Sequence, residues 1–306
     1  LKRMACVIPA LHKDFDFSKC DACLQGGGRK IPISTQPRRT SGDAAYRKPK
    51  HKFTHFGERI ASDLCGPFPE GLHGEKYTIN FYDCATEHIA IYCLPNKEKQ
   101  TVINAFLLFL SDYQHQLPNG VGEWWTDNGG EFLNRDMDKF CEELCVKRAY
   151  SIPYEPRQNP YAERANGTIL RPMRTAFQES GAPMQLWPDV AKHAALVHNI
   201  LKDSKCSSPF ERVYGKEFDY SKLHTILCLC YYLLPERDRA SKLSPRAVPA
   251  RYLGIDPIRH GHIVFIPSLQ RYHVADWFTQ IFSFSTLAKV RCRFLLEPSD
   301  RLVCLP

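Results

Sequence analysis

The chain has 306 residues, of which 43% are hydrophobic, and its 41 Lys and Arg residues against 33 Asp and Glu residues give a formal net charge of +8 at pH 7. This length suits one large domain or two modest ones, and the composition is ordinary for a soluble globular protein. The longest apolar runs, such as residues 226–234, are far too short to cross a bilayer, and no secretory signal pattern is present, so we expect an intracellular protein with no membrane partner.

The net charge and the cysteines indicate the kind of partner and the redox state of the protein. A basic chain suits a polyanionic partner, because Lys and Arg release counterions when they bind phosphates. The thirteen cysteines are an odd number spread through apolar segments, which indicates mostly reduced core residues rather than a disulfide framework. The chain begins at Leu1 rather than Met, which suggests a piece of a polyprotein.

Near the start of the chain stands half of a metal site. The spacing of Cys20 and Cys23 allows both thiolates to reach one tetrahedral Zn²⁺. Because His12 is the only histidine upstream, we expect Zn²⁺ binding only in a longer chain, and free thiols are the alternative.

A basic stretch follows at residues 24–52. It carries eight cations, among them Lys48 and Lys50, against the single anion Asp43, interleaved with Gly, Pro and Ser. This composition is typical of a flexible linker. The linker is either a solvated tether or an arm that contacts nucleic acid.

The next hundred residues predict alternating strands and helices. Three β-branched and aromatic runs indicate an antiparallel meander, and helical and strand-like periods alternate after it. The predicted strands are 59–64, 77–83, 89–94, 122–126 and 147–151, and the predicted helices are 102–110 and 134–145. The order is therefore βββαβαβ, which places Asp63 on the first strand and Asp127 at the end of the fourth.

Two more helices and a change of character complete the pattern. A helix starts near Pro160, whose missing amide is tolerated in a first turn, and Pro172 should kink this helix or split it into two. Residues 186–201 predict another amphipathic helix. Beyond Pro209, short strands at 231–234, 250–253, 263–266 and 272–274 indicate a small β-rich region.

Three acids occupy positions that chemistry would require. Asp63 lies within a strand, Asp127 ends a strand before a Gly-Gly turn, and Glu163 lies near a helix start, with thirty-five residues between Asp127 and Glu163. Carboxylates are hard ligands for Mg²⁺ or Mn²⁺, and two such ions about 3.5–4 Å apart can promote phosphoryl transfer. Asp83 is a candidate fourth ligand, with a turn-capping role as the alternative.

The segments around these acids resemble a known family. They are Ser62-Asp63-Leu64-Cys65-Gly66-Pro67, Thr126-Asp127-Asn128-Gly129-Gly130-Glu131-Phe132 and residues 152–164. In these motifs the chain resembles the integrase of copia-type LTR retrotransposons, a Pol polyprotein fragment of the retroviral integrase superfamily. Cys20-Asp21-Ala22-Cys23 resembles the end of that family's zinc finger, and residues 208–216 and 252–254 resemble the region after its catalytic core.

The resemblance implies an α/β fold with a ribonuclease H-like catalytic core, a mixed sheet with flanking helices. In that scheme a basic N-terminal linker precedes the core and a small β-rich region follows it. The implied domains are 1–23, a zinc-finger remnant; 24–52, the linker; 53–203, the core; 204–286, the β-rich region; and 287–306, an unassigned tail.

The resemblance also implies an activity. Asp63, Asp127 and Glu163 fall on the family's metal-binding triad, which implies two Mg²⁺ or Mn²⁺ ions, processing of DNA 3′ ends and strand transfer into target DNA. The implied partners are double-stranded DNA, both element ends and target, and further copies of the chain, and the implied location is the nucleus. The residues expected to contact nucleic acid are Asn159, Arg164, Arg171, Arg174, Lys48 and Lys50.

Departures from the family pattern leave alternatives open. Pro160 stands where the family usually has Gly, which stiffens the loop before Glu163, and the upstream histidines are absent. A ribonuclease H-type nuclease would use the same acids to cut rather than to join. A catalytically decayed remnant would only bind nucleic acid.

Overall fold

The structure is a computed structural model. It describes residue 25 and residues 53–127, 129–130, 132, 135–150, 160–202, 207–256, 259, 261–275 and 281–283. The chain divides into two compact units, Leu1–Phe218 and Asp219–Pro306.

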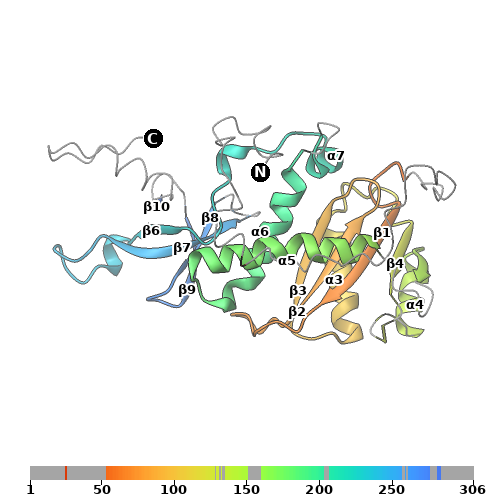
Figure 1. The fold of residues 1–306 in the computed structure, drawn as a ribbon, viewed down its shortest axis with the longest axis horizontal. Coiled ribbons are helices and arrows are strands. Elements are labelled where there is room, and N and C mark those ends of the chain that lie inside the picture. The colour runs from red at the N-terminus through yellow and green to blue at the C-terminus, as the bar shows by residue number, and fades with distance from the viewer. Residues whose placement is uncertain are drawn as a thin grey trace, which may run out of the picture. The chain divides into compact units, whose positions relative to one another are not determined.

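The first unit is built on a mixed five-stranded sheet in the order β3-β2-β1-β4-β5 (Figure 1). Strands β1 (Arg59–Cys65), β2 (Tyr77–Asp83) and β3 (Ile89–Leu94) form the antiparallel meander that the sequence predicts. Strands β4 (Glu123–Thr126) and β5 (Lys147–Tyr150) then add on parallel to β1. Parallel neighbours need a crossover, and helices supply it.

Helices cover both faces of this sheet. Side chains of α3 (Lys99–Asp112) and α4 (Arg135–Glu143) join the hydrophobic core on one face. On the other face α5 (Pro160–Ser180) packs against β1 and β2, and α6 (Trp187–Ile200) packs against β3 and α5. The short helix α7 (Pro209–Tyr214) packs on α6. A 3₁₀ turn, η3 (Met184–Leu186), joins α5 to α6.

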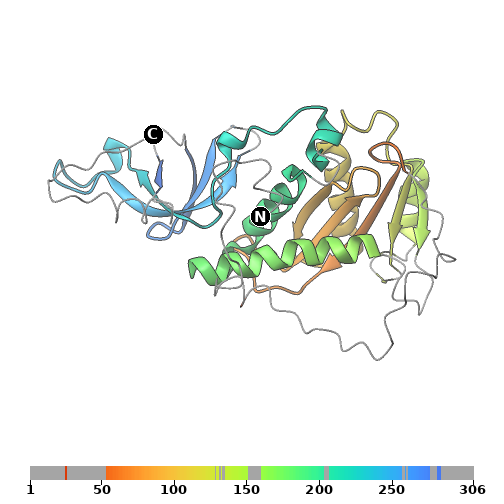
Figure 2. The same cartoon turned by 45° about the horizontal axis from the view of Figure 1, so that its top comes forward.

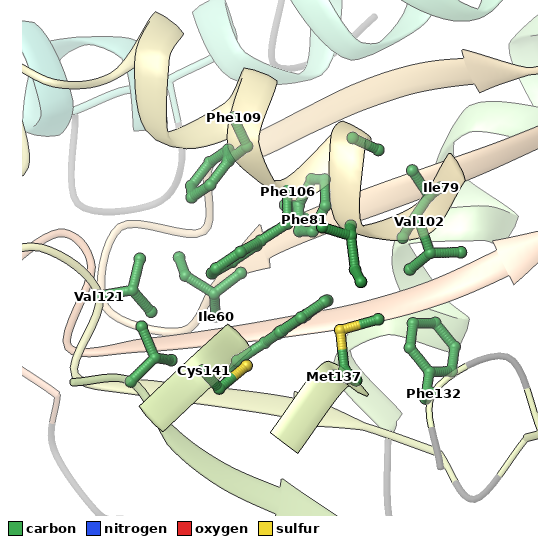
Figure 3. Close-up of a cluster of buried hydrophobic side chains, with 14 of the residues drawn as sticks. Ile60, Ile79, Phe81, Val102, Phe106, Phe109, Val121, Phe132, Met137 and Cys141 are labelled. Carbon is green, nitrogen blue, oxygen red and sulfur yellow. The ribbon is translucent and has the colours of Figure 1, made fainter. Parts of the chain in front are cut away.

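The main core lies between the sheet and helices α3 and α4 (Figure 3). At its centre the Trp124 ring stacks on Phe106, with ring centroids 4.1 Å apart and planes within 3° of parallel. The Trp124 indole Nε1–H donates to the Ser62 hydroxyl at 2.6 Å, so its one polar atom is satisfied. Trp124 is therefore a core residue.

The sheet order and the two helical layers confirm the predicted fold class, an α/β ribonuclease H-like core with a mixed sheet and flanking helices. Of the two effects predicted for Pro172, the split of the helix is wrong, because α5 runs without interruption from Pro160 to Ser180 (Figures 1 and 2), and the kink stays a prediction. Pro172 lies on the exposed side of α5, where its ring meets solvent. Buried Ile169, Met173 and Phe177 hold a neighbouring side of the helix against the rest of the unit.

Helix α7 is absent from the sequence-based prediction, although the sequence carries a signal for it. Ser208 accepts a hydrogen bond from the Glu211 amide at 3.1 Å, and the Glu211 side chain returns to the Ser208 amide. Pro209 occupies the first helical position. This is a capping box with Pro at N1, a pattern that marks a helix start.

The second unit is a five-stranded antiparallel sheet. Its order is β10-β6-β7-β8-β9, and its strands are β6 (Leu229–Leu233), β7 (Ala247–Ile255), β8 (His262–Ile266), β9 (Arg271–Ala275) and β10 (Ile281–Ser283). Two 3₁₀ turns, η4 (Tyr220–Lys222) and η5 (Glu236–Asp238), precede and follow β6. Strand β7 shifts register between Tyr252 and Gly254, where Gly254 adopts φ +140°, a value that side chains rarely tolerate.

The domain limits drawn from the sequence stay predictions. The stretches 1–23, 24–52 (except residue 25) and 287–306 lie outside the described residues. Helix α7 follows residue 203, the predicted end of the core, yet it packs on α6 and falls in the first unit. Within the described residues, no helix is both long and apolar enough to span a membrane.

The stacked pair at the core centre gives a stability prediction. Phe106→Ala removes a fully buried ring that supports Trp124, so it should lower the free energy of unfolding by about 3–5 kcal/mol in urea denaturation. The neighbouring Leu107 is 44% exposed, and Leu107→Ala should cost less than about 1 kcal/mol. Equal losses for the two variants would contradict this packing.

Candidate active site

Two of the three predicted acids are brought together by strand pairing. Strands β1 and β4 are parallel, with Ala61 opposite Trp125. Two residues further along each strand direction, on the same face, stand Asp63 and Asp127. Neighbouring strands are only about 4.8 Å apart. The register therefore places two half-buried carboxylates side by side at the same level of the sheet.

The third acid approaches from the helix above. Glu163 lies in the first turn of α5 and is exposed. One turn further, on the same helical face, the Asn166 amide Nδ2 donates to Asp63 Oδ2 at 2.8 Å. Helix α5 thus delivers both a carboxylate and a hydrogen-bond donor to the Asp63 side of the sheet.

Asp63 is the electrostatic centre of this arrangement. Burial, followed by the charges of Asp127 and Glu163, raises the pKa of Asp63 to about 6, although hydrogen bonds from the Leu64 amide and Asn166 act in the opposite direction. Ionising Asp63 costs free energy because its carboxylate is partly removed from water and faces two other negative charges. A positive charge at this position would relieve it.

The donor set suits a hard divalent cation. Asp63 and Asp127 offer adjacent carboxylate oxygens, the ligands that Mg²⁺ and Mn²⁺ prefer, and the charges of Asp127 and Glu163 add to the burial that raises the pKa of Asp63. Among the described residues, however, no three or more His, Cys, Asp or Glu side chains converge closely enough to hold one ion. Asp127 and Glu163 both lie near enough for their charges to raise the pKa of Asp63, and the role of the three acids as metal ligands stays a prediction.

The other predicted contact residues divide into two groups. Arg164, Arg171 and Arg174 are exposed along α5. The Arg164 guanidinium lies 5.3 Å from the Tyr161 ring centre, and the charge of Arg174 opposes the burial that raises the pKa of the Cys65 thiol. The second group lies outside the described residues and consists of Cys20, Cys23, Lys48, Lys50 and Asn159.

Asp83 is a turn cap and not a fourth ligand. Its carboxylate accepts from the Gly57 amide at 2.9 Å, from the Thr86 amide and hydroxyl at 2.7 Å each, and from the Ala85 amide at 3.1 Å. Burial raises its pKa and these hydrogen bonds act against the rise. With its oxygens bound to the chain itself, Asp83 closes the β2–β3 turn, which was the alternative role.

Two functional candidates escaped the sequence prediction, Asn80 and Asn166. Asn166 carries a signal in the sequence, since it follows Glu163 by three residues and so shares its helical face. Asn80 is fully buried in β2 directly opposite Asp63. Only the pairing register of β1 with β2 reveals that position, and no local pattern in the sequence reports it.

The raised pKa of Asp63 predicts how stability depends on pH. The folded chain binds more protons than the unfolded chain between about pH 4 and 6, so stability should fall as pH rises through that window. Asp63→Asn removes the charge and keeps an acceptor for Asn166. Without divalent cations near pH 7.5, this variant should be about 1–2 kcal/mol more stable than wild type in urea denaturation, and equally stable near pH 4.

The matched control is Glu143→Gln, an exposed acid at the end of α4, which should leave stability unchanged at both pH values. Adding Mg²⁺ near pH 7.5 should raise the melting temperature of wild type and not that of Asp63→Asn. A wild type that is the more stable of the two without metal would refute this account of Asp63.

Comparison with known sequences identifies related proteins. Residues 228–276 match the family model described as "Retroviral polymerase SH3-like domain", a span that contains strands β6 to β9. The chain is 26% identical over 251 residues to the retrovirus-related Pol polyprotein from transposon TNT 1-94 of Nicotiana tabacum. It is 26% identical over 272 residues to the transposon Ty1-LR3 Gag-Pol polyprotein of Saccharomyces cerevisiae.

These alignments cover 81% and 85% of the chain but only 18% and 15% of the two polyproteins. Among solved structures, the chain is similar to a simian T-cell lymphotropic virus intasome in complex with the PP2A regulatory subunit B56 gamma. The TM-score is 0.46 and the identity 14%, over 76% of this chain and 81% of that one.

The chain is also similar to the catalytic core domain of BIV integrase, with a TM-score of 0.39 and 18% identity, over 52% of this chain and 95% of that one. Both TM-scores are below 0.5, and the fold assignment therefore rests on the sheet order. The chain is homologous to a short segment of the Pol polyproteins of copia-type retrotransposons, as the motifs around Asp63, Asp127 and Glu163 predict.

Proposed function

We propose that this chain is the integrase segment of a retrotransposon Pol polyprotein, an enzyme that trims the 3′ ends of element DNA and joins them to target DNA. The observation that carries the proposal is the pairing of Asp63 with Asp127 on adjacent parallel strands, with Glu163 and Asn166 of α5 beside them. Sheet and helix together concentrate negative charge where hard cations bind.

Each residue of the site has a distinct role in this proposal. Asp63 and Asp127 would hold Mg²⁺ or Mn²⁺, and Glu163 would complete the ligand set from the first turn of α5. When bound, a divalent cation makes a water or a hydroxyl more acidic and neutralises charge on the phosphate oxygens. Asn166 keeps one oxygen of Asp63 in a fixed direction through its 2.8 Å hydrogen bond.

Neither reaction needs a covalent protein intermediate: 3′ processing hydrolyses one phosphodiester bond, and strand transfer exchanges one phosphodiester bond for another. In 3′ processing a water oxygen attacks phosphorus, and the bond to the departing 3′ oxygen breaks, leaving a free 3′ hydroxyl on the element. In strand transfer that hydroxyl attacks a target phosphodiester in the same way. The leaving oxygen takes up a proton in each step.

The basic charge of the chain supports a polyanionic substrate. Arg164 and Arg171 are separated by seven residues, or two turns, and so project from the same side of α5, with Arg174 one turn further. Exposed arginines in a row suit contacts to phosphates, which position a duplex without reading its sequence. We extend the proposal to double-stranded DNA as substrate, to assembly of several copies, and to action in the nucleus.

The test is a joining assay with labelled element-end DNA and a target duplex in Mg²⁺ or Mn²⁺. Wild type should yield joined products. Asp63→Asn and Glu163→Gln should lower joining more than about 100-fold, because loss of a direct ligand should exceed the loss of an outer partner. Glu179→Gln removes an exposed acid near the other end of the same helix and should leave joining intact.

Two outcomes would replace the proposal. Metal-dependent cleavage confined to the RNA strand of an RNA–DNA hybrid would assign a ribonuclease H-type nuclease. Binding of DNA by wild type and by Asp63→Asn alike, with no joined product from either, would assign a nucleic-acid-binding remnant.

A further inference from the structure

A buried side-chain amide, that of Asn80, lies next to Asp63 in the sheet. Asn80 occupies the middle of β2, is fully buried, and stands directly opposite Asp63 in the antiparallel register. Its neighbours in the strand, Ile79 and Phe81, are apolar core residues. A polar side chain at such a position requires a reason, because burying an amide costs free energy unless its hydrogen bonds are made.

The nitrogen of this amide makes the contacts. Asn80 Nδ2 lies 2.7 Å from Asn166 Oδ1, 3.3 Å from the Asp63 carbonyl oxygen and 3.5 Å from the Ala162 carbonyl oxygen. An amide has two hydrogens, so one serves Asn166 and the other is shared by the two carbonyls. The Asn80 Oδ1 atom is buried and has no hydrogen-bond partner among the residues that the structure describes. Asn80 therefore contributes to this network only through the two hydrogens of its Nδ2 atom.

The main chain determines which way this amide faces. Carbonyl oxygens only accept, so turning the Asn80 amide over would set its oxygen against those of Asp63 and Ala162. With the nitrogen held there, Asn166 must present its oxygen to Asn80. Its own nitrogen is then directed at Asp63 Oδ2, at 2.8 Å. The orientation of one buried amide thus dictates the orientation of the next.

We propose that Asn80 is a positioning residue for metal binding, which sets the direction of the Asn166 amide and through it the direction of the Asp63 carboxylate. The inference rests on the proposed function in one respect, that Asp63 is a metal ligand. Partners that orient a ligand from behind affect affinity strongly, typically by 10- to 100-fold on removal. Asn80 touches neither metal nor DNA and acts only through its neighbours.

The experiment is a double-mutant cycle in which isothermal titration calorimetry measures Mn²⁺ binding by the full 306-residue chain. Asn166→Ala should weaken Mn²⁺ binding about 10-fold or more, and Asn80→Ala by about 3- to 10-fold. The double variant should bind like Asn166→Ala alone, within about twofold, because Asn80 has nothing left to orient. Independent effects that multiply would overturn the proposal.

Asn199→Ala is the matched control. Asn199 is a buried asparagine of α6 that donates to the Ile89 carbonyl at 2.8 Å and accepts from the Ile89 amide at 2.9 Å. Its loss should lower stability in urea as Asn80→Ala does, with Mn²⁺ Kd unchanged. If both variants shift Kd equally, Asn80 is only structural and the proposal fails.

A further variant keeps the test decisive if Asn80→Ala does not fold. Asn80→Ser retains one donor for the main-chain carbonyls and is too short to reach Asn166, so the same weakening is expected. Mn²⁺ binding that depends on Asn80 in a chain that joins no DNA would sustain this inference and refute the proposed function. Mn²⁺ affinity unchanged in a folded Asn80 variant, or no Mn²⁺ binding by wild type, would refute the inference.

Discussion

The parallel pairing of β1 with β4 is the constraint on which the rest of the first unit depends. On one face of these strands Ile60 and Trp124 stand opposite each other, both fully buried against α3. Because side chains alternate, burying these two residues turns Asp63 and Asp127 to the other face at one level. A slip of one residue would send Trp124 to the wrong face, so hydrophobic burial maintains a register that carboxylate repulsion opposes.

On the opposite face, α5 partly stabilises the negative charges of Asp63 and Asp127. The partial positive charge of its first turn favours nearby anions, and its Asn166 amide donates to Asp63. Neither effect balances the burial and the neighbouring acids, since the pKa of Asp63 still rises to about 6. The protein thus holds two acids together in a place where they destabilise the metal-free chain.

The parts of the fold that the sequence predicts are those governed by local periodicity. Strands β2 and β3 were predicted at 77–83 and 89–94, as observed, because runs of β-branched and aromatic residues between turn-rich segments mark them. Asp63 and Asp127 could be placed on strand positions, yet their closeness depends on the β1–β4 register, which is a tertiary property. From the sequence alone, Asn80 is a polar residue that interrupts an apolar strand, and Pro172 is a residue that should break a helix. Only the packing in the folded structure shows that both are accommodated.

The clearest departure from a local rule lies beside Asp63. Asn80 is a fully buried polar residue of β2 on the same face as Asp63, where an apolar side chain would give the more stable sheet. A ligand site needs oriented oxygens, and orientation requires hydrogen-bond donors beneath them, which only buried polar groups supply. The local loss of stability and the proposed capacity to bind a cation therefore arise from the same side chains, and the aromatic core around Trp124 offsets that loss.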